Sequence, residues 1–222
     1  MKMTKAPEAK NPKTADHVSP LLRVEGLVWK LKRSVDGLVD FYCRLTRIEA
    51  PEASDMISRK ADSLMRKGRY GKAIDQYSEL IRMGREEAGI YYRLGLCCER
   101  EGMGEEAEKA YKKVTELDAD HVDAPYRLGL LAIKRDDAQT AVEYLSALAG
   151  TNEDSFDILY NLGVAHDKLQ DYEKAVEAFK KAIAIEPGYS KVHKRLGHAY
   201  DAMGKHQDAI ECFKKAMELE EI

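Results

Sequence analysis

The feature that most constrains this chain is a repeat of 34 residues that runs without a gap from Ser54 to Ile222. Shifting the sequence against itself by this period predicts five units, which begin at Ser54, Ala88, Val122, Phe156 and Ser190. Within each unit, position 8 is small, position 20 is alanine and position 24 is bulky. A repeat of this length requires every unit to adopt the same local structure, so the sequence predicts similar elements stacked in a row.

The side chains at these positions indicate what the units look like. Position 8 holds Ala61, Gly95, Gly129, Gly163 and Gly197. Position 24 holds Tyr77, Tyr111, Leu145, Phe179 and Phe213. Two antiparallel helices approach closely only where side chains are small, and bulky residues then fill the space toward the next unit. Glycines near position 15 and Pro187 at position 32 are suited to ending helices. Each unit is therefore predicted to be a helix-turn-helix hairpin.

The pattern of Leu-Gly, Ala, Phe or Tyr, and Pro at these spacings resembles the tetratricopeptide repeat. This resemblance covers residues 54–222. It implies an all-α fold, a right-handed α-solenoid of five helix-turn-helix repeats preceded by an N-terminal amphipathic helical segment. The predicted units are 54–87, 88–121, 122–155, 156–189 and 190–222. Proteins of this type bind other proteins.

The stretches 156–183 and 191–220 also resemble the magnetosome-associated repeat proteins of magnetotactic bacteria, with Lys191-Val192-His193 and Met203-Gly204-Lys205-His206 as the less common features. That resemblance implies a cytoplasmic homo-oligomer that coats the cytoplasmic face of the magnetosome membrane as a peripheral scaffold. It would recruit peptides or tails of magnetosome membrane proteins with acidic and apolar residues. The alternative is a generic cytosolic adaptor or co-chaperone that captures acidic peptide tails.

The composition argues against several other classes of protein. Residues 1–53 carry a net charge of +3 and residues 54–222 one of −6, which is too weak a basic footprint for a nucleic-acid binder. No apolar run approaches the ~18 residues of a membrane span, and the first residues lack the apolar core of a signal peptide. No nucleophile–base pair, phosphate loop, metal site or cofactor motif stands out, so no enzyme is predicted. The cysteines lack disulfide or zinc-ligand spacing and are Cys43, Cys97, Cys98 and Cys212.

The family resemblance implies a binding groove along the first helix of each unit, lined chiefly by positions 2, 5, 6, 9, 12 and 13. Helical periodicity agrees, because positions 2, 5, 9 and 13 lie along one stripe of a helix. Position 5 is tyrosine and position 9 aliphatic in the middle three units, as Tyr92, Tyr126 and Tyr160, then Leu96, Leu130 and Val164. Positions 6 and 13 are mostly basic: Arg59, Arg93, Arg127, Asn161 and Arg195, then Arg66, Arg100, Lys134 and Lys168. Tyrosine and arginine are frequent interface anchors, so the sequence predicts a groove for a peptide with apolar anchors and acidic flanks.

Two further interpretations of these residues stay open. In the first, the tyrosines pack between adjacent first helices and the arginines pair with acids of neighbouring units such as Asp123, Asp157 and Asp167. In the second, the last units bind a C-terminal carboxylate. Some tetratricopeptide repeat proteins do this with five polar residues, and this chain has matching residues at only three of those positions, Asn161, Lys191 and Arg195. A looser carboxylate site near the last units is the corresponding expectation.

The segment before the repeats allows three interpretations. Residues 1–18 are polar and predicted to be disordered, whereas 19–53 carries an apolar seam at alternating spacings of three and four residues. The seam consists of Leu21, Val24, Val28, Leu31, Val35, Leu38, Tyr42 and Leu45. It can belong to a degenerate sixth repeat, to a helix that pairs with another protomer, or to a basic helix on an anionic membrane surface. The first two predict self-association.

A hinge is also predicted near 149–155, where unit three lacks anchoring apolar residues.

Overall fold

The computed structural model describes residues 50–151 and 155–221 of the chain. The predicted tail 1–18, nearly all of the segment 19–53 and the middle of the predicted hinge lie outside these residues. The chain divides into two compact units, Met1–Met56 and Ile57–Ile222, and the second unit holds the repeats. In the part that the structure describes there are ten helices and no strand, which confirms the predicted all-α class.

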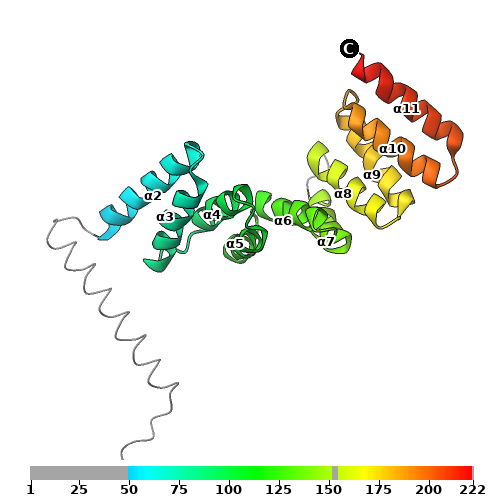
Figure 1. Cartoon of the computed structure of the whole chain (residues 1–222). Coiled ribbons are helices and arrows are strands. Elements are labelled where there is room, and N and C mark those ends of the chain that lie inside the picture. Colours follow the sequence, from blue (N-terminus) through cyan, green and yellow to red (C-terminus); the bar gives the residue numbers. More distant parts are fainter. Residues whose placement is uncertain (1–49, 152–154, 222) are drawn as a thin grey trace, which may run out of the picture. The chain divides into compact units, whose positions relative to one another are not determined.

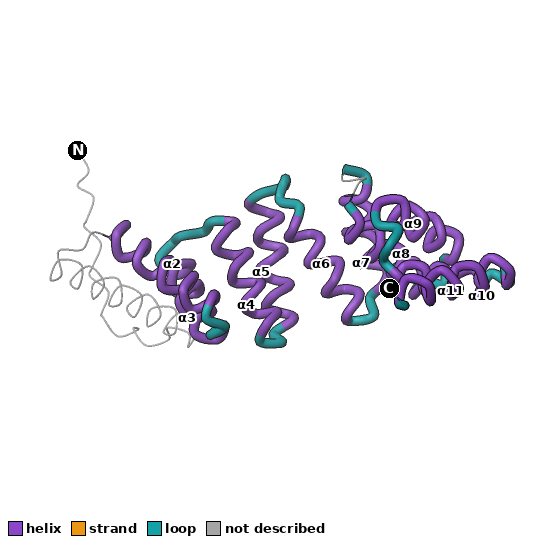
Figure 2. Tube along the Cα trace, turned by 90° about the horizontal axis from the view of Figure 1, so that it is seen from above, coloured by secondary structure: helices purple, strands orange, loops and turns teal. Residues whose placement is uncertain are grey.

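The helices alternate as the first and second members of antiparallel pairs (Figure 1). The first helices are α2 (Ala50–Arg66), α4 (Ala88–Arg100), α6 (Asp123–Lys134), α8 (Phe156–Lys168) and α10 (Ser190–Ala202). The second helices are α3 (Tyr70–Arg82), α5 (Gly104–Leu117), α7 (Ala138–Ala149), α9 (Tyr172–Ile185) and α11 (His206–Glu220). Short loops join them in the trace of Figure 2. None of the described helices is long and apolar enough to cross a membrane.

All five hairpins turn through a residue in the left-handed backbone region. Three of these residues are glycines, with φ of 68° at Gly68, 78° at Gly102 and 74° at Gly204. The other two are Asp136 at 65° and Gln170 at 61°. Paired backbone hydrogen bonds close these turns in the Schellman arrangement, which satisfies carbonyls at the end of the first helix. The first helix therefore ends at the same place in each unit, with or without glycine.

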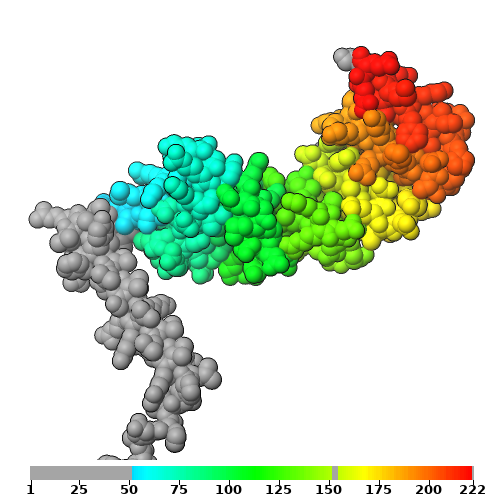
Figure 3. All heavy atoms as spheres, viewed as in Figure 1, coloured from blue at the N-terminus to red at the C-terminus, as the bar shows by residue number. Residues whose placement is uncertain are grey.

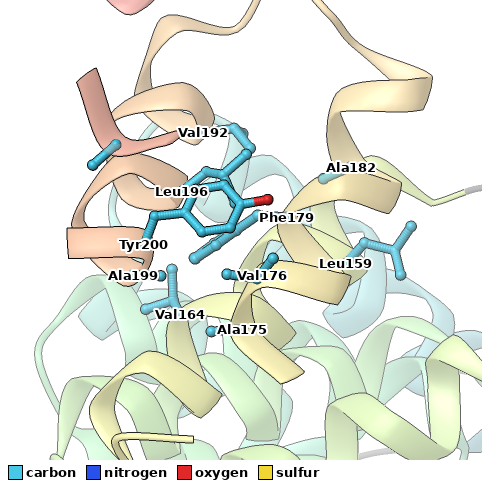
Figure 4. Packing of buried hydrophobic residues seen from close by; sticks show 11 residues of the cluster. Leu159, Val164, Ala175, Val176, Phe179, Ala182, Val192, Leu196, Ala199 and Tyr200 are labelled. Atoms are coloured by element: carbon cyan, nitrogen blue, oxygen red, sulfur yellow. The ribbon is translucent and has the colours of Figure 1, made fainter. Parts of the chain in front are cut away.

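The small residue at position 8 lets the two helices of a hairpin touch. A Cβ atom added at Gly163 of α8 would lie 2.5 Å from the Phe179 ring of α9, and one at Gly95 of α4 would lie 2.6 Å from the Tyr111 ring of α5. The bulky residue at position 24 thus covers the glycine of its own hairpin. Phe179 also belongs to a core with Val192 of the next hairpin (Figure 4), as the sequence pattern predicts.

Successive hairpins stack through such shared cores, so each one completes the burial of its neighbour. Contacts join α3 to α4, α5 to α6, α7 to α8 and α9 to α10. The space-filling view shows the side chains of these hairpins meeting from α3 to α11 (Figure 3). The unit Ile57–Ile222 is therefore a right-handed α-solenoid of helix-turn-helix repeats, in which the first helices of adjacent repeats lie next to one another.

Candidate functional site

The surface formed by the first helices, from Ile57 of α2 through α4, α6 and α8 to α10, is termed the first-helix face, and it carries the tyrosines at position 5. Each is half-buried. The Tyr92 ring packs against His121 with centroids 4.8 Å apart, while Tyr160 stacks on Phe156 at 6.0 Å. The Tyr126 hydroxyl accepts a hydrogen bond of 3.1 Å from Asn161 Nδ2 in the next hairpin. The tyrosines thus pack between neighbouring elements and still keep part of their surface available.

The aliphatic residues at position 9 do not behave alike. Leu96 and Leu130 are half-buried, whereas Val164 is only 6% exposed and belongs to the core that also holds Phe179 and Tyr200 (Figure 4). The prediction that Val164 lines an open groove is therefore wrong. The reason is packing: α10 contributes a bulky buried Tyr200 to this core, and Val164 is enclosed with it.

Three of the arginines at position 6 reach back to an acid on the preceding first helix. Arg93 Nε lies 3.4 Å from Asp62 Oδ1, and Arg195 Nη1 lies 3.3 Å from Asp167 Oδ2. Arg127 Nη1 lies 3.6 Å from a Glu99 carboxylate oxygen. Among the interpretations that the sequence leaves open, pairing with acids of neighbouring units describes these three arginines, and Asp167 is one of the expected acids. Their charges are largely compensated within the solenoid.

Two of these acids also accept a hydrogen bond from a buried tyrosine at position 24. The Tyr77 hydroxyl donates to Asp62 Oδ1 at 2.7 Å, and the Tyr111 hydroxyl donates to Glu99 Oε2 at 2.9 Å. Burial, together with the adjacent carboxylate, raises the pKa of both phenols, so both stay protonated donors. Asp62 and Glu99 are not among the residues predicted from the sequence, because they stand at different positions of their units, 9 and 12. Only a search for acids along the whole preceding first helix would find both.

The basic residues at position 13 divide differently. Lys168 Nζ lies 2.5 Å from Asp136 Oδ1 of the preceding turn. Arg66, Arg100 and Lys134 are exposed, and no ion pair or hydrogen bond joins their side chains to any other described residue. They stand in the last turns of α2, α4 and α6, where a cation also interacts favourably with the helix dipole. These are the basic positions whose charge is available to a ligand.

The three residues that match a carboxylate clamp are not equally free. The Asn161 amide also donates to the Asp157 carbonyl at 2.8 Å, in addition to Tyr126, and Arg195 is paired with Asp167. Lys191 is exposed, with no ion pair to the rest of the described chain. A ligand carboxylate would therefore meet one free cation and two engaged side chains here.

The described residues offer little for covalent or metal chemistry. Cys97 and Cys98 are 0% and 2% exposed, and burial raises the pKa of Cys97 to about 11, so this thiol is not a ready nucleophile. In residues 50–151 and 155–221 there is no cluster of three histidine, cysteine or acidic side chains that could hold a metal ion. The self-association residues predicted in 21–45 lie outside the described part.

Comparison with known proteins agrees with the hairpin geometry. One tetratricopeptide repeat model matches residues 156–189 and 190–221, and a second matches residues 58–122. The chain belongs to the tetratricopeptide repeat family.

Within that family, the chain is similar to solved structures of MamA. One crystal structure of MamA is 30% identical, with a TM-score of 0.69 over 72% of this chain and 94% of that one. A second MamA crystal structure is 29% identical, with a TM-score of 0.73 over 77% of this chain and 93% of that one. MamA from Desulfovibrio magneticus RS-1, from its residue 41 to the end, is 27% identical, with a TM-score of 0.72 over 76% of this chain and 95% of that one. A search of curated protein sequences finds no match.

Proposed function

We propose that the chain is a protein-interaction scaffold, not an enzyme, and that it captures a segment of a partner on the first-helix face. One observation carries the proposal. Arg66, Arg100 and Lys134 keep exposed, uncompensated charges among the described residues, and they recur at the 34-residue period of the repeat. A row of like charges at a regular spacing suits an extended ligand that passes from one repeat to the next.

The chemistry of the face indicates the ligand. The free cations favour carboxylates, while the half-buried Tyr92 and Tyr126 offer rigid surface with a polar tip to an apolar side chain. An exposed ion pair contributes only about 0.2–1 kcal/mol, so several such contacts must add up. The ligand is therefore a peptide with apolar anchors and acidic flanks. The paired Arg93, Arg127 and Arg195 stabilise the contact between adjacent repeats and contribute less to binding of the peptide.

Binding of the full chain to a labelled peptide tests this chemistry. The peptide carries leucine and tyrosine anchors flanked by glutamates, and the control peptide has glutamine in place of each glutamate. The glutamate peptide should bind about tenfold more tightly at low salt, and the difference should shrink as salt screens the charges. Equal affinities for the two peptides at low salt would show that charge does not contribute to recognition.

The similarity to MamA, together with the apolar seam at 21–45, supports a second part of the proposal. The chain self-assembles and coats the cytoplasmic face of a magnetosome membrane as a peripheral scaffold in a magnetotactic bacterium. Deleting residues 1–47 should lower the mass of the particle in solution, measured by light scattering. A truncated chain that assembles as before would exclude this segment from self-association.

A second candidate is a generic cytosolic adaptor for acidic peptide tails, and the exposed Lys191 near the partly matching carboxylate places favours it. The two candidates differ in what they recognise at the end of a peptide. Amidation of the C-terminus should weaken binding several-fold if a tail carboxylate is captured. It should leave the affinity unchanged if the face binds internal acidic segments.

A further inference from the structure

A cavity of about 590 Å³ opens against α8 and α9 beside the C-terminal end of α7, and none of the cations and tyrosines of the first-helix face lines it. Its apolar lining comes from Ala149 at the end of α7, Leu159 and Leu162 of α8, and Ile185 of α9. Pockets that take small ligands have volumes of roughly 300–1,000 Å³. The cavity is thus large enough for an aromatic side chain together with part of its backbone.

Among the described residues, the cavity lining carries no uncompensated charge. Lys174 and Lys181 stand at its edge, but Lys174 Nζ lies 2.7 Å from Asp171 Oδ2 and Lys181 Nζ lies 2.9 Å from Glu177 Oε1. A charged ligand would have to displace one of these partners, whereas a neutral ligand would not. The charge balance therefore selects an uncharged occupant.

His166 is a buried polar side chain that lines this cavity. His166 is 8% exposed, and its Nδ1 atom is buried with no hydrogen-bond partner in the described structure. Asp171 Oδ2 lies 3.6 Å from Nδ1, beyond hydrogen-bond distance. Because Nδ1 is shielded, only the other ring nitrogen, Nε2, is within reach of a ligand. A ligand hydroxyl or N–H that donates to Nε2 fixes the proton on Nδ1, where it faces the carboxylate.

The helix beside the cavity is also unusual among the second helices. Glu143 is the one charged residue among the twelve of α7, whereas α3, α5, α9 and α11 carry between four and seven acidic or basic residues each. Ser146 and Ala147 on α7 are small and exposed. Interface cores are depleted of charged residues, so the low charge of α7 is compatible with an interface. Small side chains such as these also let a partner backbone approach closely.

We propose that this cavity is a second binding site, which takes a tyrosine or tryptophan side chain from an uncharged segment of a partner protein. The ring occupies the apolar cavity, its hydroxyl or indole N–H donates to His166, and the segment passes over the exposed side of α7. This site does not depend on the cations of the first-helix face. A scaffold built this way holds an acidic segment and a neutral aromatic segment at the same time.

The test is a titration of the full chain with small probes, followed by methyl NMR. N-acetyl-tryptophanamide and N-acetyl-tyrosinamide should shift the methyl signals of Leu159, Leu162 and Ile185, and N-acetyl-alaninamide should not. N-acetyl-tyrosinamide should bind about fivefold more tightly than N-acetyl-phenylalaninamide, the gain of one hydrogen bond. That preference should disappear in His166→Leu.

A plugged variant supplies the control. Ala184 is exposed at the edge of the cavity, so Ala184→Phe should block probe binding without disturbing the core, whereas Ala202→Phe at the exposed end of α10 should not. Circular dichroism verifies that both variants are folded. Shifts that persist in Ala184→Phe, or that spread over every hairpin, would overturn the proposal. Placing glutamates around a tryptophan in a short peptide should not tighten binding at this site, which separates it from the first-helix face.

Discussion

Replacing Gly163 by alanine probes the contact that sets the distance between α8 and α9. The added Cβ would lie 2.5 Å from Cε1 and 2.6 Å from Cδ1 of Phe179. Carbon atoms in contact are normally about 3.5–4.0 Å apart, so the methyl group is roughly 1 Å too close. Phe179 is fully buried among residues of two hairpins (Figure 4), and its ring has no exposed space into which to move.

Two opposing terms decide the magnitude of this effect. Alanine is better than glycine in a helix interior by about 1 kcal/mol. Overpacking a well-filled core costs about 1–3 kcal/mol, and contact with several ring atoms places this site at the upper end. We expect a net loss of about 1–2 kcal/mol in the free energy of unfolding. For a solenoid of this size that loss lowers Tm by about 3–6 °C.

Thermal and urea unfolding followed by circular dichroism measure this loss. Gly71→Ala is the matched control, because its Cβ would meet nothing closer than Glu101 Oε1 at 3.8 Å. It should leave the stability unchanged or raise it slightly. The double variant Gly163→Ala/Phe179→Leu should be more stable than the sum of its single changes predicts, since the smaller side chain leaves room for the methyl group.

An increase in stability on Gly163→Ala alone would show that the added methyl group does not clash with the Phe179 ring. Unit one shows what such an accommodation looks like, because Ala61 stands at position 8 there and is buried in one core with Tyr77. If the hairpin α8–α9 could open in the same way, glycine at position 8 would not be a packing requirement.

Three further predictions concern a buried hydroxyl, an ion pair between repeats and a buried histidine. Tyr111→Phe should cost about 1 kcal/mol, measured by urea unfolding, because the buried hydroxyl no longer donates to Glu99. Arg127→Gln should lower the free energy of unfolding by up to about 1 kcal/mol, and a Glu99→Gln/Arg127→Gln double-mutant cycle should show positive coupling. Strictly additive effects of the two substitutions would show that this ion pair does not stabilise the stacking of the repeats. Burial lowers the pKa of His166 from its usual 6.5, so below about pH 6.5 the unfolded chain binds a proton that the folded one does not. Stability should therefore fall more steeply between pH 6.5 and 5 in the wild type than in His166→Gln, and parallel curves would contradict this.

The fold was predictable because its contacts repeat with the sequence. The glycine at position 8 and the bulky residue at position 24 meet within one hairpin, so their spacing alone indicates the pairing. The turn of unit three was less predictable, since Asp136 replaces the expected glycine. Aspartate tolerates the left-handed region better than most residues, and the hairpin keeps the same geometry with φ of 65°.

The site was predictable only in part, because its pairing does not follow the period. The acids that hold the arginines stand at position 9 in Asp62 but at position 12 in Glu99 and Asp167. When equivalent positions of the five units are compared, the basic residues recur at one position, but the acids that pair with them do not. Val164 likewise differs from Leu96 because of Tyr200 in the next hairpin, which no single unit reveals.

The uncompensated cations at the ends of the first helices should recognise an acidic partner segment. This recognition is measured as the affinity of the glutamate peptide for Arg100→Glu/Lys134→Glu, compared with Lys72→Glu/Lys109→Glu, which changes the net charge equally on the second helices. We expect a loss of about thirtyfold for the first variant, equivalent to about 2 kcal/mol, and little change for the second. Equal losses in the two variants would show instead that net charge alone attracts the peptide.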